Sequence, residues 1–128
     1  MLRNSAITTM LPARDADRAS HFYADTLGLH LTAKSPDGTY YFEAGHGDAI
    51  GLRPLPDAQP SDNTAMSFEV SDIAGEVAEL EGRGVQFQDF DSGELRTVDH
   101  IATLGNEKAA WFADTEGNIL CLHEVIGQ

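Results

Sequence analysis

The chain has 128 residues, a net charge of -13 and one cysteine. Its length suits one compact domain or two half-size modules that share a core, and 41% hydrophobic residues argue against disorder. A single cysteine excludes an internal disulfide framework and four-cysteine zinc sites, and the acidic charge disfavours nucleic acid and anionic membranes as partners. No apolar run is long enough to span a bilayer and the N-terminal segment lacks a signal-peptide core, so we expect a cytoplasmic protein.

The first part of the chain predicts a strand followed by a helix. Residues 6–11 mix apolar and β-branched side chains, which indicates a strand that ends at Pro12. Asp15 is a candidate helix N-cap, and the apolar residues after it recur at helical spacing until Gly28 ends the helix.

Three further strands complete this first half. The turn residues Pro36, Asp37 and Gly38 separate two of them. The predicted strands are 29–33, 39–43 and 49–55.

A linker and a second run of similar elements follow. Residues 54–63 contain three prolines and no hydrophobic period, so they read as the linker. After a predicted strand at 65–70, Asp72 is a second N-cap candidate. The helix that it begins has an apolar stripe, which consists of Ile73, Val77 and Leu80. Gly82 and Gly84 end this helix, and a strand is predicted at 85–90.

Residues 110–124, AWFADTEGNILCLHE, form two apolar runs around an acidic, glycine-containing turn. This pattern predicts a β-hairpin. Residues 40–53, YYFEAGHGDAIGLR, are a weaker copy in which Tyr41 corresponds to Trp111 and Gly51 to Cys121.

The repeat predicts two tandem βαβββ modules within a single domain of residues 1–128, the first at about 5–55 and the second at about 64–126. The helix caps and the hairpins require different shifts, so the second module has extra chain within 88–108. We expect a long loop there, of the kind that can cover a ligand cleft as a lid.

Three segments resemble the vicinal oxygen chelate superfamily, the glyoxalase, bleomycin-resistance and dioxygenase proteins. They are ARDADRASHFYADTLGL, EVSDIAGEVAELEGRGV and WFADTEGNILCL, and the likeness is closest to uncharacterised glyoxalase-like members. The resemblance implies an α+β fold in which tandem βαβββ modules form a curved eight-stranded mixed sheet with a concave ligand cleft. It also implies a homodimer.

Metal-dependent members of that superfamily draw their ligands from four strand positions. By this resemblance those positions are Thr8, Gly51, Ala65 and Cys121. Alanine and glycine offer no side-chain donor, threonine is a poor one, and one cysteine cannot hold a catalytic ion. We therefore expect no metal and no other cofactor.

Strand alternation assigns the side chains that face the inferred cleft. Apolar residues such as Phe68 and Leu120 are expected to face the helices, and their neighbours to face the ligand. The predicted ligand-binding residues are Thr8, Met10, Tyr41, Gly51, Arg53, Ala65, Ser67, Glu69, His100, Trp111, Cys121 and His123.

Each chemically capable residue has a second interpretation. Arg53 suits a ligand carboxylate or phosphate, or an ordinary salt bridge. His123, Glu69 and His100 are the candidate acid–base groups, and His100 is the histidine that we expect to contact ligand from the long loop; a structural or merely exposed histidine is the alternative. Cys121 and His123 share a strand face but stand too far apart for direct contact, so a small apolar wall residue is the preferred reading of Cys121.

Three functions compete. The first is a metal-independent protein that binds a small aromatic or cationic metabolite or drug. The second is a metal-independent lyase or isomerase of the same superfamily that uses His and Glu side chains. The third, a metal-dependent glyoxalase I-like lyase or dioxygenase, conflicts with the residues at the four ligand positions.

Overall fold

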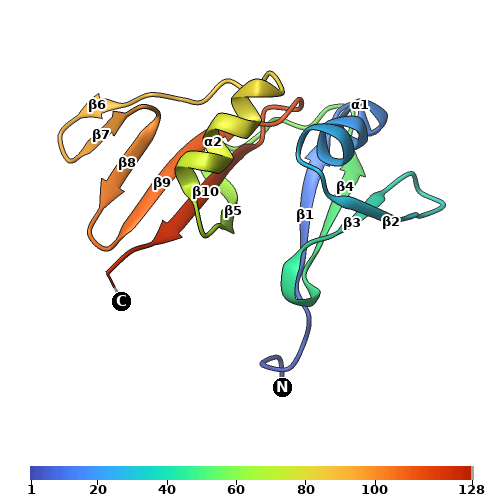
Figure 1. Cartoon of the computed structure of the whole chain (residues 1–128). Coiled ribbons are helices and arrows are strands. Elements are labelled where there is room, and N and C mark those ends of the chain that lie inside the picture. Colours follow the sequence, from blue (N-terminus) through green and yellow to red (C-terminus); the bar gives the residue numbers. More distant parts are fainter. Residues whose placement is uncertain (128) are drawn as a thin grey trace. The chain divides into compact units, whose positions relative to one another are not determined.

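The computed structural model describes residues 1–127 and divides into two compact units, Met1–Pro60 and Ser61–Gln128 (Figure 1). Each unit has its own mixed sheet and its own helix. Within residues 1–127, no helix is long and apolar enough to cross a membrane.

The first unit is a βαβββ module. Its four-stranded sheet has the order β1-β4-β3-β2, in which β1 runs parallel to β4 and the other pairs are antiparallel. Its elements are β1 (Thr8–Ala13), α1 (Ala16–His21), the π-helix η1 (Phe22–Thr26), β2 (His30–Lys34), β3 (Tyr40–Glu43), the 3-10 turn η2 (Gly45–Gly47) and β4 (Ala49–Pro54).

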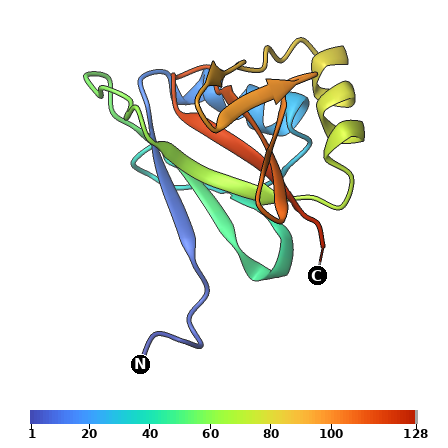
Figure 2. The same cartoon turned by 90° about the vertical axis from the view of Figure 1, so that its left-hand side faces the viewer.

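The second unit repeats this plan and enlarges it. Its six-stranded sheet has the order β5-β10-β9-β8-β7-β6, with β5 parallel to β10, and α2 lies along one face of the sheet (Figures 1 and 2). Its elements are β5 (Thr64–Glu69), α2 (Ile73–Gly82), β6 (Asp91–Ser92), β7 (Leu95–Val98), β8 (Ile101–Leu104), β9 (Glu107–Ala113) and β10 (Ile119–Val125). The predicted α+β class and the tandem arrangement are confirmed.

Both predicted helix caps are present. An Asp15 side-chain oxygen accepts a hydrogen bond from the Arg18 amide at 3.0 Å, and Asp72 accepts one from the Gly75 amide at 3.1 Å. These carboxylates satisfy amides that have no partner inside the helix. Gly28 follows the first helical segment with a φ of 74°, a conformation that glycine adopts without strain.

Each unit buries its own aromatic and aliphatic side chains under its helix. In the first, the rings of Tyr23 and Phe42 are fully buried, with centroids 6.0 Å apart. In the second, the predicted α2 stripe is buried together with Phe112 and Leu120. Alternation along β4 and β10 therefore places the core residues on the helix side, as predicted.

The first strand does not end at Pro12 as predicted. β1 continues to Ala13, and Pro12 stands opposite Arg53. The carbonyls of Ile7 and Ala13 accept bonds from the β4 side, so odd-numbered residues form the ladder. Pro12 is even-numbered, so the ladder with β4 does not use its backbone nitrogen. Its lack of an amide hydrogen therefore costs no hydrogen bond to β4, and the strand continues through it.

The predicted strand at 85–90 is also wrong. Only an isolated bridge from Phe87 to Phe112 and a hydrogen bond from the Gln88 amide to the Trp111 carbonyl are formed there. β8 pairs with the start of β9 along the same edge, which leaves the incoming chain only the last residues of β9. β8 thus takes the place that β2 has in the first unit.

The extra segment at 88–108 is folded into strands rather than an open loop. β6, β7 and β8 form an antiparallel meander that extends the sheet beyond β9. Within residues 1–127, seven of the eight expected strands are present, and β6, β7 and β8 are additional to them.

A buried carboxylate closes the β9–β10 hairpin. Asp114 Oδ1 accepts hydrogen bonds from the amides of Glu116 (2.8 Å) and Asn118 (2.9 Å), while Oδ2 accepts one from the Asn118 side-chain amide (2.9 Å). Gly117 turns the chain with a φ of 90°. Because three donors converge on one side chain, the turn fixes which residues of β9 and β10 pair.

We predict that Asp114→Ala lowers the free energy of unfolding by about 3 kcal/mol, because it leaves buried donors without an acceptor. Asp114→Asn keeps one carbonyl oxygen and should lose about 1 kcal/mol. Urea denaturation followed by Trp111 fluorescence measures both. Asp57→Ala, an exposed linker change, is the control; equal midpoints for Asp114→Ala and the control would contradict the assignment.

Candidate functional site

The two faces of the second sheet differ in what covers them. Leu120, Leu122 and Glu124 alternate along β10, and Glu124 Oε1 accepts a hydrogen bond from the Ile73 amide at the start of α2 (2.8 Å). These side chains therefore face the helix. Cys121 and His123 point to the opposite face, which we call the open face.

Strand register gathers polar side chains on the open face. Cys121 stands between Ser67 of β5 and Trp111 of β9, and His123 stands opposite Glu69. These five residues were all predicted to line the ligand site, and the structure brings them together. Ala65, predicted with them, lies next to a register shift at the start of the β5–β10 ladder and is exposed.

His123 joins two of these side chains. Its Nδ1 lies 2.5 Å from the Ser67 hydroxyl oxygen, and its Nε2 lies 3.7 Å from Glu69 Oε1. The His123 side chain is 22% exposed and that of Glu69 is 73% exposed. The imidazole is therefore held between a hydroxyl and a solvated carboxylate, and a small molecule on this face can reach both.

Cys121 occupies the floor between them. Its thiol is buried and donates a hydrogen bond to the Leu122 carbonyl at 3.2 Å. Burial raises the pKa of the thiol, and the hydrogen bond with Ser67 offsets this only in part. The protonated thiol is a poor nucleophile, which agrees with the reading of Cys121 as a wall residue.

Phe90 adds a residue that the sequence did not indicate. Its ring meets Trp111 edge-on, with centroids 5.5 Å apart at 84°. The Phe90 amide donates to the Thr97 hydroxyl at 2.9 Å, and that hydroxyl also contacts Asp89 at 3.1 Å. Phe90 lies in the chain before β6, where no periodicity marks it as a neighbour of Trp111.

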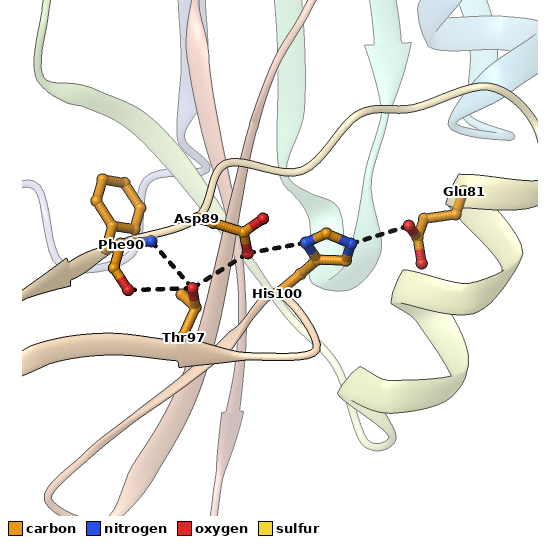
Figure 3. A network of polar contacts seen from close by, with 5 residues as sticks. All are labelled: Glu81, Asp89, Phe90, Thr97 and His100. Carbon is orange, nitrogen blue, oxygen red and sulfur yellow. Dashed lines mark hydrogen bonds and ion pairs between the residues drawn. The ribbon is translucent and has the colours of Figure 1, made fainter.

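His100 belongs to a different cluster. Figure 3 shows its ring between Asp89, whose Oδ1 lies 2.9 Å from Nδ1, and Glu81 of α2, whose Oε2 lies 3.0 Å from Nε2. The ring also stacks on Phe87, which in turn packs against Phe112. His100 therefore lies on the α2 side of the sheet, away from Ser67 and His123.

Two hollows flank this cluster. One of about 380 Å³ is lined by Asp89, Phe90, Asp91, Arg96 and Thr97, and one of about 300 Å³ lies between α2 and the β7–β8 turn beside His100. Asp91 is already paired with Arg96 at 3.0 Å, and Asp89 with His100. The charges at these hollows are largely matched within the protein.

The remaining predicted residues lie in the first unit. Met10 of β1 and Tyr41 of β3 flank Gly51 of β4, and a Cβ atom on Gly51 would come within 2.7 Å of the Met10 sulfur. Glycine here makes room for the thioether and the phenol ring. Thr8 and Arg53 are exposed on the same two strands, β1 and β4.

Comparison with known proteins is consistent with this architecture. The family model described as the Glyoxalase/Bleomycin resistance protein/Dioxygenase superfamily matches residues 6–122. The chain belongs to this superfamily. Among curated proteins, none gives a significant match to the sequence.

Solved structures of other proteins share the fold. A member of the superfamily from Sphaerobacter thermophilus DSM 20745 is 21% identical, with 97% of this chain and 99% of that chain covered and a TM-score of 0.77. TnmS3, an antibiotic binding protein from Streptomyces sp. CB03234, is 23% identical over 98% of each chain, with a TM-score of 0.76. A lactoylglutathione lyase from Agrobacterium tumefaciens is 19% identical over 94% of this chain and 93% of that chain, with a TM-score of 0.72. At such identities the likeness shows the fold alone.

The side chains present do not fit the metal of the superfamily's metal-dependent members. Thr8, Gly51, Ala65 and Cys121 stand at the four positions that the resemblance assigns to metal ligands. Met10 and Tyr41 flank Gly51, and Ser67 and Trp111 flank Cys121. Within residues 1–127, no group of three or more His, Cys, Asp and Glu side chains is arranged to hold a metal ion. Hydroxyl, thioether and one buried thiol make a poor donor set for a divalent ion.

We predict that His100 stabilises the second unit more at low pH than at high pH. Hydrogen bonding to Asp89, and then the charges of Asp89 and Glu81, raise the pKa of His100 above its ordinary value. Its stabilising effect is therefore complete below the ordinary value near 6.5 and disappears as pH rises through the raised value.

His100→Asn should accordingly lower the melting temperature more at about pH 6 than at about pH 9. Asparagine tolerates the positive φ of 72° at this position, which limits other effects of the change. Differential scanning fluorimetry gives the two differences. His30→Asn, a change at an exposed strand residue outside this cluster, is the control. Equal losses for His100→Asn at both pH values would contradict the bridge.

Proposed function

We propose that this protein binds a small aromatic or cationic molecule on the open face of its second sheet, without a metal. The observation that carries the proposal is the grouping of Trp111 and Phe90 on the same face as the exposed carboxylate of Glu69. An aromatic pair offers a stacking surface, and a carboxylate with 73% exposure is available to a cation.

The net charge of the chain and its structural similarity to a binding protein support the same proposed function. The net charge of -13 attracts cations to the surface and repels nucleic acid and anionic membranes. TnmS3, which shares the fold, is described as an antibiotic binding protein. Drug or metabolite binding by this chain is consistent with that relative, and a single free thiol at Cys121 suits the reducing cytoplasm.

A metal-independent enzyme is the second candidate, because His123 lies between a hydroxyl and a carboxylate. A metal-dependent lyase or dioxygenase is disfavoured by the donor set at Thr8, Gly51, Ala65 and Cys121.

We predict that planar aromatic cations, such as acridinium and phenanthridinium dyes, raise the melting temperature. A ligand at 100 times its Kd adds about 2.7 kcal/mol to the free energy of unfolding. Glu69→Gln and Trp111→Ala should each weaken binding about tenfold, since a charge contact or a stacking surface of this kind contributes roughly 1–2 kcal/mol. Titration calorimetry measures the change.

Glu43→Gln, an exposed carboxylate of the first unit, is the matched control and should leave the affinity unchanged. Treatment with EDTA should also leave it unchanged. Loss of binding after metal removal, or formation of lactoylglutathione from methylglyoxal and glutathione, would overturn the metal-independent reading. Equal affinities for Glu69→Gln and Glu43→Gln would move the site elsewhere.

We also propose that two copies of the chain form a homodimer. In the sheet of the first unit β1 is an outer strand; Met10 on it is 46% exposed, and Ile7 immediately before it is 66% exposed. Outer strands with apolar side chains are commonly covered by a partner. Light scattering should give twice the mass of 13.8 kDa; a monomeric mass at micromolar concentration would contradict the dimer.

A further inference from the structure

We propose that Ser67, His123 and Glu69 form a metal-independent acyl-transfer site, in which Ser67 is the nucleophile. The inference depends on the proposed ligand face and names a reaction that this face could perform. Its substrates would be small esters with an aromatic leaving group.

Ser67 and His123 are in direct contact. A serine hydroxyl becomes a nucleophile when an adjacent base accepts its proton as it attacks. Nδ1 of His123 lies 2.5 Å from the Ser67 oxygen, within the reach that such a transfer requires. The two residues come from parallel neighbouring strands, so rigid backbone rather than a loop positions them.

Glu69 occupies the third place in this arrangement. Its carboxylate lies 3.7 Å from Nε2, the ring nitrogen on the far side from Ser67. A carboxylate there favours the tautomer with the proton on Nε2, which leaves Nδ1 free to accept the serine proton. It also stabilises the imidazolium that forms during attack. Glu69 therefore acts through His123 as a positioning residue.

Cys121 does not compete for the role of nucleophile. Its thiol is buried, donates to the Leu122 carbonyl, and has a raised pKa. Ser67, by contrast, is exposed. The neighbour that is intrinsically the better nucleophile is thus kept protonated and enclosed, and the hydroxyl is presented to solvent.

The aromatic pair sets the substrate class. Trp111 lies on β9, two strands from Ser67, so the two backbones are about 10 Å apart. A flat ester can cross Cys121 with its acyl group at Ser67 and its ring against Trp111 and Phe90. A naphthyl ester has about the required length.

The reaction balances without a metal or a redox partner. The Ser67 oxygen bonds to the acyl carbon while its proton passes to Nδ1 of His123. The tetrahedral adduct then breaks its bond to the leaving aryl oxygen, which takes the proton from Nδ1 and departs as a phenol or naphthol. Water attacks the acyl-serine by the same route, releasing the carboxylic acid and restoring the Ser67 hydroxyl.

The test is incubation of the full-length protein with 2-naphthyl acetate and with a fluorophosphonate probe. Naphthol release and peptide mass spectrometry report turnover and the modified residue. We expect modification at Ser67, and at least a tenfold slower acylation in Ser67→Ala and in His123→Ala. Glu69→Gln should lower kcat about threefold and leave KM for the neutral ester unchanged, which a structural role would not produce.

Ser71→Ala, an exposed serine outside the site, is the matched control and should keep the rate. Ser67→Cys retains a nucleophile and should still be acylated, which separates loss of chemistry from loss of fold. Modification at Cys121, an unmodified Ser67, or an unchanged rate in Ser67→Ala would overturn the inference. If the protein binds dye but is not acylated, the acyl-transfer inference fails and the binding proposal remains. If it is acylated at Ser67 but binds no dye, the binding proposal fails and the acyl-transfer inference remains.

Discussion

The turn held by Asp114 is the constraint on which the second unit depends. Its carboxylate binds the amides of Glu116 and Asn118, so β10 returns beside β9 with Cys121 opposite Trp111. Side chains alternate along a strand, and a slip of one residue would turn His123 towards α2 and Leu122 away from it. The core and the open face are therefore specified by the same turn.

Features encoded locally could be predicted from the sequence. The caps at Asp15 and Asp72 and the β9–β10 hairpin depend on residues close together in the chain. The position of β8 could not be predicted in this way. Residues 85–90 have strand composition, but β8 pairs along the same edge of β9, and that competition is decided by tertiary contacts.

The candidate site shows the same division. Alternation correctly placed Ser67 and Glu69 with His123 on one face of the sheet. The contact between Ser67 and His123 depends on the register between β5 and β10, which shifts near Ile119 and leaves no mark in the sequence. Phe90 was missed because it precedes β6 in irregular chain and meets Trp111 only through the folded meander.

The two histidines that the sequence offered as acid–base groups differ in their neighbours. His100 has a carboxylate at each ring nitrogen and the Phe87 ring stacked against it. The two carboxylates hold the imidazole protons, and the stacked ring fixes the position of the side chain. It serves to join α2 to the turn between β7 and β8.

His123 has a hydroxyl at one nitrogen and a more distant carboxylate at the other. A hydroxyl can give up its proton as well as accept a hydrogen bond, whereas a carboxylate in an ion pair only holds one. Of the two histidines, His123 on the open face is therefore the one suited to the proposed proton transfer. The segment at 88–108 contributes to that face through Phe90 rather than through His100.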